Sequence, residues 1–206
     1  NVLLTGRSYG DASGYDYATI KYSGAGVPLW TNRYTGPGNF QDIAMDVAVD
    51  TNGNVFVTGE SYDATSSSYA TTKYSGAGVP LWTNRYKLWL NGYDGARALA
   101  VDTSGDVLVT GISMEGVGSF TDYATIKYSG AGVPLWTNRY SGTARAVAAD
   151  GLGNVFVTGT AGFDYATLAY SGAGVPLWTN SYAGPDGSTD TATAVAVEGV
   201  GNVFGT

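Results

Sequence analysis

A ten-residue string, SGAGVPLWTN, occurs four times without a change in this chain. Each copy follows a tyrosine-rich segment such as DYATIKY and precedes an alanine- and valine-rich run that leads to NVFVTG or a close variant. The interval between copies is about 50 residues, which is typical of propellers, solenoids and repeat arrays. One repeat is long enough for four short strands and their turns. The four copies of the string lie at 23–32, 75–84, 129–138 and 171–180.

Each repeat is predicted to form four strands, which we name A to D in chain order. In strand A, alanine alternates with valine, leucine or methionine, and this period of two favours a strand over a helix. Strand B is the NVFVTG segment, strand C is YATIKYS, and strand D is VPLWTNRY, all rich in β-branched and aromatic residues. The A–B and C–D connections contain glycine and predict tight hairpins. Strand A is expected at 44–50, 96–102, 144–150 and 192–198.

The A–B turn opens with an acidic residue, Asp50 in the second repeat, and this pattern also resembles part of a calcium loop. No bidentate glutamate follows, and the later copies place glycine, leucine or valine where ligands would be needed. We therefore expect a plain turn, no bound metal and no cofactor.

Proline stands near the start of every strand D, at Pro28, Pro80, Pro134 and Pro176. Because proline cannot donate a hydrogen bond to a neighbouring strand, strand D is expected at the edge of its sheet, with strand A innermost. A four-stranded meander repeated around an axis is a propeller blade. The predicted fold is an all-β propeller of four-stranded antiparallel blades, with four repeats in the chain.

We expect one propeller domain over 1–206, closed by pairing of the N- and C-terminal strands. The segment 202–206 is then a surplus copy of strand B that competes with 1–6. Two alternatives stay open: the chain is a stretch of a longer array, or strand exchange between chains closes a larger ring. The predicted blades are 190–198 with 1–34, then 42–86, 94–140 and 143–182.

The phrase DYATIKYSGAGVPLWTNRY, followed by ARAVAAD and GNVFVTG, resembles the bacterial β-propeller repeat known as the seven-bladed propeller (SBBP) repeat, and more distantly the NHL repeat. The resemblance implies a propeller in a secreted or cell-surface bacterial protein, often beside other domains. It implies no catalytic residues. This chain departs from the family in having four repeats, and Ala169 and Ser181 replace the lysine and arginine of the other copies. A secreted protein would be represented here by its mature form or a fragment.

The composition excludes several kinds of site. The formal net charge is −7, and an acidic surface disfavours nucleic acid and anionic membranes as partners. The chain has no histidine and no cysteine, which argues against zinc sites, Ser-His-Asp triads and disulfides. No apolar run reaches the length of a membrane span, so we expect no membrane insertion.

The variable connections, B–C and D–A, lie at one end of each predicted blade, and loops on a rigid scaffold often carry binding residues. Trp89 is the one tryptophan outside the repeated string. We predict that it could form an aromatic platform for a sugar ring, and the alternative is that Trp89 simply packs against a blade. The residues expected to join it are Tyr93, Tyr62, Tyr9 and Phe40.

Two arginines, Arg97 and Arg145, occupy the same place in strand A. Two guanidinium groups near a central channel could hold a carboxylate ligand. The alternative is that they form ion pairs with nearby acids, namely Asp42, Asp94 or Asp46.

Three functions fit these features. The first is a non-catalytic scaffold or interaction module, which we expect from the resemblance and from the lack of a chemical constellation. The second is a carbohydrate-binding propeller that uses the variable loops. The third is a polysaccharide lyase or hydrolase built on carboxylates, arginine, lysine and tyrosine. Expected partners are a protein or a glycan at the variable loops, with homo-oligomers arising by strand exchange.

Overall fold

The computed structural model describes residues 1–10, 14–116, 120–185, 187–199 and 202–206. In these ranges the regular structure consists of β-strands and no helix, so no helix there could span a membrane. The chain divides into two compact units, Asn1–Ala96 and Arg97–Thr206. The prediction of an all-β fold is confirmed.

The first unit contains a three-stranded sheet and a four-stranded sheet, both antiparallel. We call them the first and second blades. The first blade has the order β1-β2-β3 and the second has β4-β5-β6-β7. Their strands are β1 (Val2–Gly10), β2 (Gly14–Tyr22), β3 (Pro28–Tyr34), β4 (Asp42–Val49), β5 (Val55–Tyr62), β6 (Ser67–Tyr74) and β7 (Pro80–Tyr86).

The third blade has the order β11-β10-β9-β8, and its strand β8 begins in the first unit and continues into the second. The fourth blade has the order β12-β13-β14-β15, and β16 pairs with β17 in a separate small sheet. These strands are β8 (Tyr93–Val101), β9 (Val107–Met114), β10 (Thr121–Tyr128), β11 (Pro134–Ser141), β12 (Thr143–Ala149), β13 (Val155–Ala161), β14 (Asp164–Tyr170), β15 (Pro176–Tyr182), β16 (Val195–Glu198) and β17 (Asn202–Gly205).

The order A-B-C-D is confirmed in the second, third and fourth blades, and the first blade has the order B-C-D. Strand D lies at one end of the sheet in all four. Each of the four prolines is the first residue of its strand D, where its missing N–H costs no ladder hydrogen bond. Closure of a ring by the terminal strands stays a prediction. In the structure β16 pairs with β17, and β1 forms an end of its sheet.

Strand A departs from the strict alternation that its sequence predicts. The pairing register shifts between Ala44 and Asp46 in β4, and between Ala144 and Ala146 in β12. Met45 and Arg145 are therefore the extra residues of two β-bulges, which interrupt the ladder and re-aim a side chain. Both side chains are exposed.

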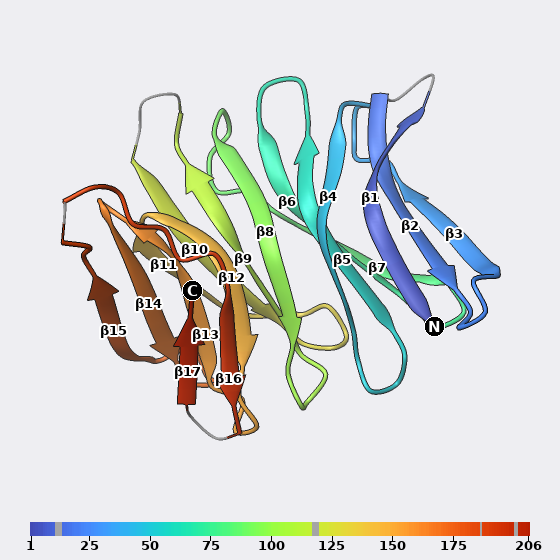
Figure 1. Ribbon diagram of the computed structural model, residues 1–206. Coiled ribbons are helices and arrows are strands. Elements are labelled where there is room, and N and C mark those ends of the chain that lie inside the picture. Colours follow the sequence, from blue (N-terminus) through green and yellow to red (C-terminus); the bar gives the residue numbers. More distant parts are fainter. Residues whose placement is uncertain (11–13, 117–119, 186, 200–201) are drawn as a thin grey trace. The chain divides into compact units, whose positions relative to one another are not determined.

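The meander places the A–B and C–D turns at one end of each blade, which we call the turn end. The B–C and D–A connections lie at the other, the loop end. In the second blade, the β4–β5 turn lies low in Figure 1 and the β5–β6 loop lies high. The A–B turn has Gly53 at a φ of 79°, and Asp50 Oδ1 accepts hydrogen bonds from the backbone N–H groups of Asn52 and Asn54. These bonds are those of a plain turn, as expected.

Neighbouring blades are joined by the repeated side chains. In the first unit, the indole N–H of Trp30 on β3 donates to the carbonyl oxygen of Gly76 over 3.2 Å. The amide of Asn32 donates to Gly78 O over 2.7 Å. Tyr17, which is fully buried, donates its hydroxyl to Ala70 O over 3.1 Å. The tryptophan and asparagine of one strand D thus form hydrogen bonds with the Gly-Ala-Gly turn of the next blade.

The same bonds recur in the second unit. Trp136 donates to Gly172 O over 3.1 Å, and Asn138 donates to Gly174 O over 2.7 Å. Each unit also has its own cluster of buried apolar side chains. The cluster draws its residues from strands A, B and C of two neighbouring blades. Because identical residues make identical bonds in both units, the repeated sequence encodes blade-to-blade packing.

The strand C lysines of the second and third blades form ion pairs within their own blades. Lys73 and Lys127 are buried and pair with the acids that open the A–B turns, at 4.0 Å from Asp50 and 2.8 Å from Asp102. Their long stems bring the ammonium group to an acid two strands away, at the turn end of the blade.

Candidate functional site

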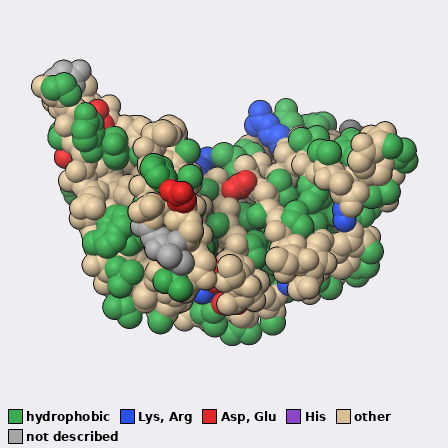
Figure 2. Space-filling model, turned by 60° about the horizontal axis from the view of Figure 1, so that its bottom comes forward, with side chains coloured by type: hydrophobic (Ala, Val, Ile, Leu, Met, Phe, Trp, Pro, Cys, Tyr) green, Lys and Arg blue, Asp and Glu red, His purple; other side chains and the backbone are tan. Residues whose placement is uncertain are grey.

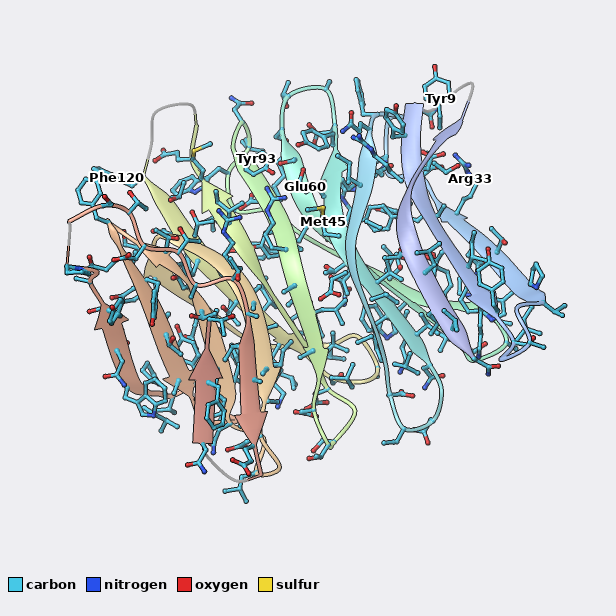
Figure 3. All side chains as sticks on the ribbon, viewed as in Figure 1. Tyr9, Arg33, Met45, Glu60, Tyr93 and Phe120 are labelled. Carbon is cyan, nitrogen blue, oxygen red and sulfur yellow. The ribbon has the colours of Figure 1, made fainter. Side chains whose placement is uncertain are left out.

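The loop end of the second blade is built around one buried carboxylate, Glu60, at the end of β5. The side chain of Tyr62 donates its hydroxyl to Glu60 Oε2 over 2.8 Å, and Tyr93 donates to Oε1 in a short hydrogen bond. The centroids of the two tyrosine rings lie 6.4 Å apart. Figure 3 shows Glu60 and Tyr93 near one another. The carboxylate fixes both rings in place.

A second carboxylate, Asp63, shapes the B–C loop of the same blade. Its Oδ1 accepts hydrogen bonds from the backbone N–H groups of Thr65 and Ser66, each over 3.0 Å. Its Oδ2 accepts from Lys87 Nζ over 2.9 Å. The hydrogen bond from Thr65, supported by Lys87, lowers the pKa of Asp63 well below its usual value. Asp63 therefore ties the B–C loop to the D–A connection.

A third carboxylate closes the D–A connection. Asp94, fully buried, accepts a hydrogen bond from the backbone N–H of Leu88 over 2.9 Å, and its own N–H donates to Ser67 Oγ. Asp42 makes the equivalent bond to Gly36 N in the preceding connection, over 2.6 Å, and burial raises the pKa of Asp42. Asp42 and Asp94 were both predicted as possible partners of an arginine. In the structure each accepts a hydrogen bond that stabilises a D–A connection.

The predicted aromatic residues are distributed as follows. The structure brings Tyr62 and Tyr93 together, and Trp89 is half-buried in the adjoining connection between the exposed Leu88 and Leu90. Tyr9 lies at the loop end of the first blade, where its ring packs edge-on against Tyr15 with centroids 5.5 Å apart. Phe40 lies in the first D–A connection and is exposed. A sugar-binding role for these residues stays a prediction.

The two predicted arginines differ in their settings. Arg145 is the bulge residue of β12 and is exposed, whereas Arg97 is half-buried in β8. A shared carboxylate ligand for them stays a prediction. Parts of three variable connections, residues 11–13, 117–119 and 186, lie outside the described residues.

Sequence reasoning missed Glu60 and Asp63 in the second blade's loops, and it named Asp94 only as a possible partner of an arginine. Glu60 was the easiest to find, because the residue at its repeat position is Arg7, Ile112 or Thr160 in the other copies. A singular acid after an otherwise repeated strand is a signal for local function or local structure. In the described ranges, no group of three or more acidic side chains is arranged to hold a metal ion.

Hydrophobic side chains reach the surface at many places, and charged ones are sparse (Figure 2). Three described residues of the variable connections are large, apolar and strongly exposed. Leu90 is 84% exposed, Phe120 93% and Phe163 72%. At the turn end, by contrast, the exposed valines are the same residue in every copy. The loop end therefore presents the apolar surface that differs from blade to blade.

Comparison with known proteins agrees with this architecture. A family model described as SBBP, beta-propeller repeat, matches residues 30–63. The chain contains an SBBP β-propeller repeat. The matched SBBP segment runs from strand D of the first blade to strand B of the second, so it spans the junction at which Trp30 and Asn32 reach the next blade.

Among solved structures, a protein from Lactobacillus plantarum superposes with a TM-score of 0.60 at 16% identity, covering 98% of this chain and 61% of that protein. This chain thus spans about three fifths of that protein's length. A eukaryotic initiation factor structure gives a TM-score of 0.48 at 8% identity over 88% of this chain and 42% of that one. No curated protein sequence matches. The first of these likenesses concerns the fold alone.

Proposed function

We propose that this chain is a non-catalytic SBBP propeller module, an interaction scaffold of a secreted or cell-surface bacterial protein that binds a protein partner through the loop ends of its blades. The observation that carries the proposal is a contrast between the repeated residues and the residues of the variable connections. The repeated tryptophans and asparagines are engaged between blades, whereas the variable connections expose Leu90, Phe120 and Phe163. Exposed apolar residues on a rigid scaffold are typical of interaction surfaces.

The carboxylates of the second blade support a binding role over a catalytic one. Glu60, Asp63 and Asp94 accept hydrogen bonds from groups that shape the loops. A loop end ordered in advance loses less conformational entropy when a partner binds. The resemblance to SBBP repeats supports the location outside the cell.

A phage-displayed library of random peptides provides the test, because such peptides select surfaces suited to protein contacts. Peptides selected on the unaltered protein are tested against two matched triple variants. We expect the loop-end variant to lose binding at least tenfold and the turn-end variant to keep it. The opposite pattern, or a library that yields no binders, would contradict the proposal. The loop-end variant carries Leu90→Asp, Phe120→Asp and Phe163→Asp, and the turn-end variant carries Val79→Asp, Val133→Asp and Val175→Asp.

Carbohydrate binding is the second candidate, favoured by one observation. Tyr62 and Tyr93 hold their rings beside the Glu60 carboxylate, with Trp89 in the adjoining connection. Aromatic rings next to a carboxylate can stack on a sugar and accept its hydroxyl groups. A glycan array would support this function if binding resists EDTA and is lost in Trp89→Ala. Binding that persists in that variant, or no binding, would argue against it.

A further inference from the structure

The contact between neighbouring blades has two halves. The donor half is the tryptophan and asparagine of strand D, and the acceptor half is the pair of glycine carbonyl groups in the next C–D turn. Where both halves are present, as in Asn138 with Gly174, both are at least partly buried. The distances repeat closely, at 2.7 Å for both asparagine bonds and 3.1 to 3.2 Å for both indole bonds.

The fourth blade exposes a donor half. Trp178 is 39% exposed and Asn180 is also exposed, whereas the equivalent Trp136 and Asn138 are half-buried. Every residue of β15 is exposed. Strand β17 lies nearby, and a hollow remains there, lined by Tyr165, Thr167, Trp178, Asn180, Val203 and Gly205.

The first blade exposes an acceptor half. Gly24 and Gly26 are exposed, whereas Gly76 and Gly78 are half-buried. A Cβ atom added at Gly78 would lie 2.7 Å from Trp30 Cγ, but one added at Gly26 would meet no atom within 4 Å. The turn that tryptophan covers in the second blade is thus open in the first. Val2 and Leu4 of β1 are also more than half exposed.

The two halves also carry complementary charges. In the second and third blades a strand C lysine pairs with the acid at the end of strand A, as Lys127 does with Asp102. The first blade has the lysine, Lys21, which donates to Gly76 O over 2.7 Å as Lys127 donates to Gly172 O. Its sheet is β1-β2-β3 and contains no strand A to supply the acid. The small sheet has the acid: Glu198 ends β16, stands at the same repeat position as Asp102, and is exposed.

We propose that the first blade of a second copy of this chain docks against the fourth blade, so that copies associate head to tail. Trp178 and Asn180 donate hydrogen bonds to the carbonyl groups of Gly24 and Gly26 of the other copy. Strand β1, nine residues long, replaces the four-residue β17 beside β16 and brings Lys21 to Glu198. Both halves are exposed in one chain, and such a heterologous contact satisfies both.

Disulfide trapping tests this contact cleanly, because the natural sequence contains no cysteine. Chains carrying Val2→Cys are mixed with chains carrying Val197→Cys in a glutathione redox buffer. Val2 stands at the repeat position of Val203, which pairs with Val197, so the two cysteines would face one another across β1 and β16. We expect a covalent dimer on a non-reducing gel, at least fivefold above the yield with Leu152→Cys, an exposed position on the fourth blade's A–B turn. Adding Trp178→Ala to the Val197→Cys chain should lower the yield.

Two results would overturn the proposal. One is a yield no higher than that of the Leu152→Cys control, which would indicate random collision. The other is a chain carrying both Val2→Cys and Val197→Cys that forms an internal disulfide and stays monomeric at high dilution, which would mean that each chain fills its own fourth-blade surface. Light scattering of the unaltered protein should show a mass that rises above 21.3 kDa with concentration.

Discussion

The indole N–H of Trp136 donates a hydrogen bond to the carbonyl oxygen of Gly172, 3.1 Å away on the next blade of the same unit. Trp178 belongs to an identical ten-residue string, yet its indole is exposed. The same sequence therefore stabilises the fold at one position and leaves a surface open at another. Which role it takes depends on the blade that follows.

Gly78→Ala should destabilise the protein more than Gly26→Ala. Both glycines have φ near 80°, so alanine is strained at both, by about 1 kcal/mol. Only at Gly78 does the new methyl group meet Trp30, at 2.7 Å, and such overpacking costs about 1–3 kcal/mol more. Urea denaturation of both variants measures the difference. Equal losses would mean that Trp30 moves aside freely.

Stability should fall as the pH rises above about 10. Burial raises the pKa of Tyr170 to about 12, and it also raises the pKa of Tyr17 and Tyr123. An unfolded tyrosine ionises near pH 10, so the unfolded state loses its proton first, and the stabilisation present below pH 10 is lost between pH 10 and 12.

Tyr170→Phe should flatten this alkaline decline by up to about 1.4 kcal/mol per pH unit, one proton's worth. Chemical denaturation between pH 9 and 11.5 measures the slope. Tyr9→Phe is the matched control, since Tyr9 is exposed. An unaltered slope in Tyr170→Phe would show that Tyr170 ionises as readily in the folded protein as in the unfolded chain.

Glu60→Gln should loosen the loop end of the second blade. A carboxylate accepts from both Tyr62 and Tyr93, but a glutamine has one acceptor oxygen, so one hydroxyl group loses its acceptor. We expect a loss of about 1–3 kcal/mol and faster amide exchange in 60–68 and 87–93. Exchange measured by mass spectrometry resolves these segments. Protection identical to that of the unaltered protein would contradict the role given to Glu60.

Lys127→Met should cost about 3 kcal/mol or more, because it leaves Asp102 buried without its cation. The fourth blade provides the comparison, since Ala169 already stands at the lysine position there. Ala169→Lys should place a cation near Asp150 and change stability little. Thermal unfolding of both variants checks the pair, and a harmless Lys127→Met would show that the ion pair contributes nothing.

Features set by local chemistry could be predicted from the sequence. Pro80 marked an edge strand and Gly53 marked a tight turn, because each restricts the backbone at its own position. The bulges at Met45 and Arg145 were missed, since register depends on the partner strand. Glu60 was missed for a similar reason: its partner Tyr93 lies 33 residues away, outside any repeated pattern.

The central claim is that the repeated side chains serve to join one blade to the next. It is tested most directly by Asn32→Ala, Asn138→Ala and Asn180→Ala, measured by urea denaturation at low protein concentration. The first two should each lower the free energy of unfolding by about 1–2 kcal/mol, because a 2.7 Å hydrogen bond to the next blade is lost. Asn180→Ala, exposed on β15, should stay within about 0.5 kcal/mol of the unaltered protein. Three equal losses would contradict the claim, since asparagine would then act within its own blade.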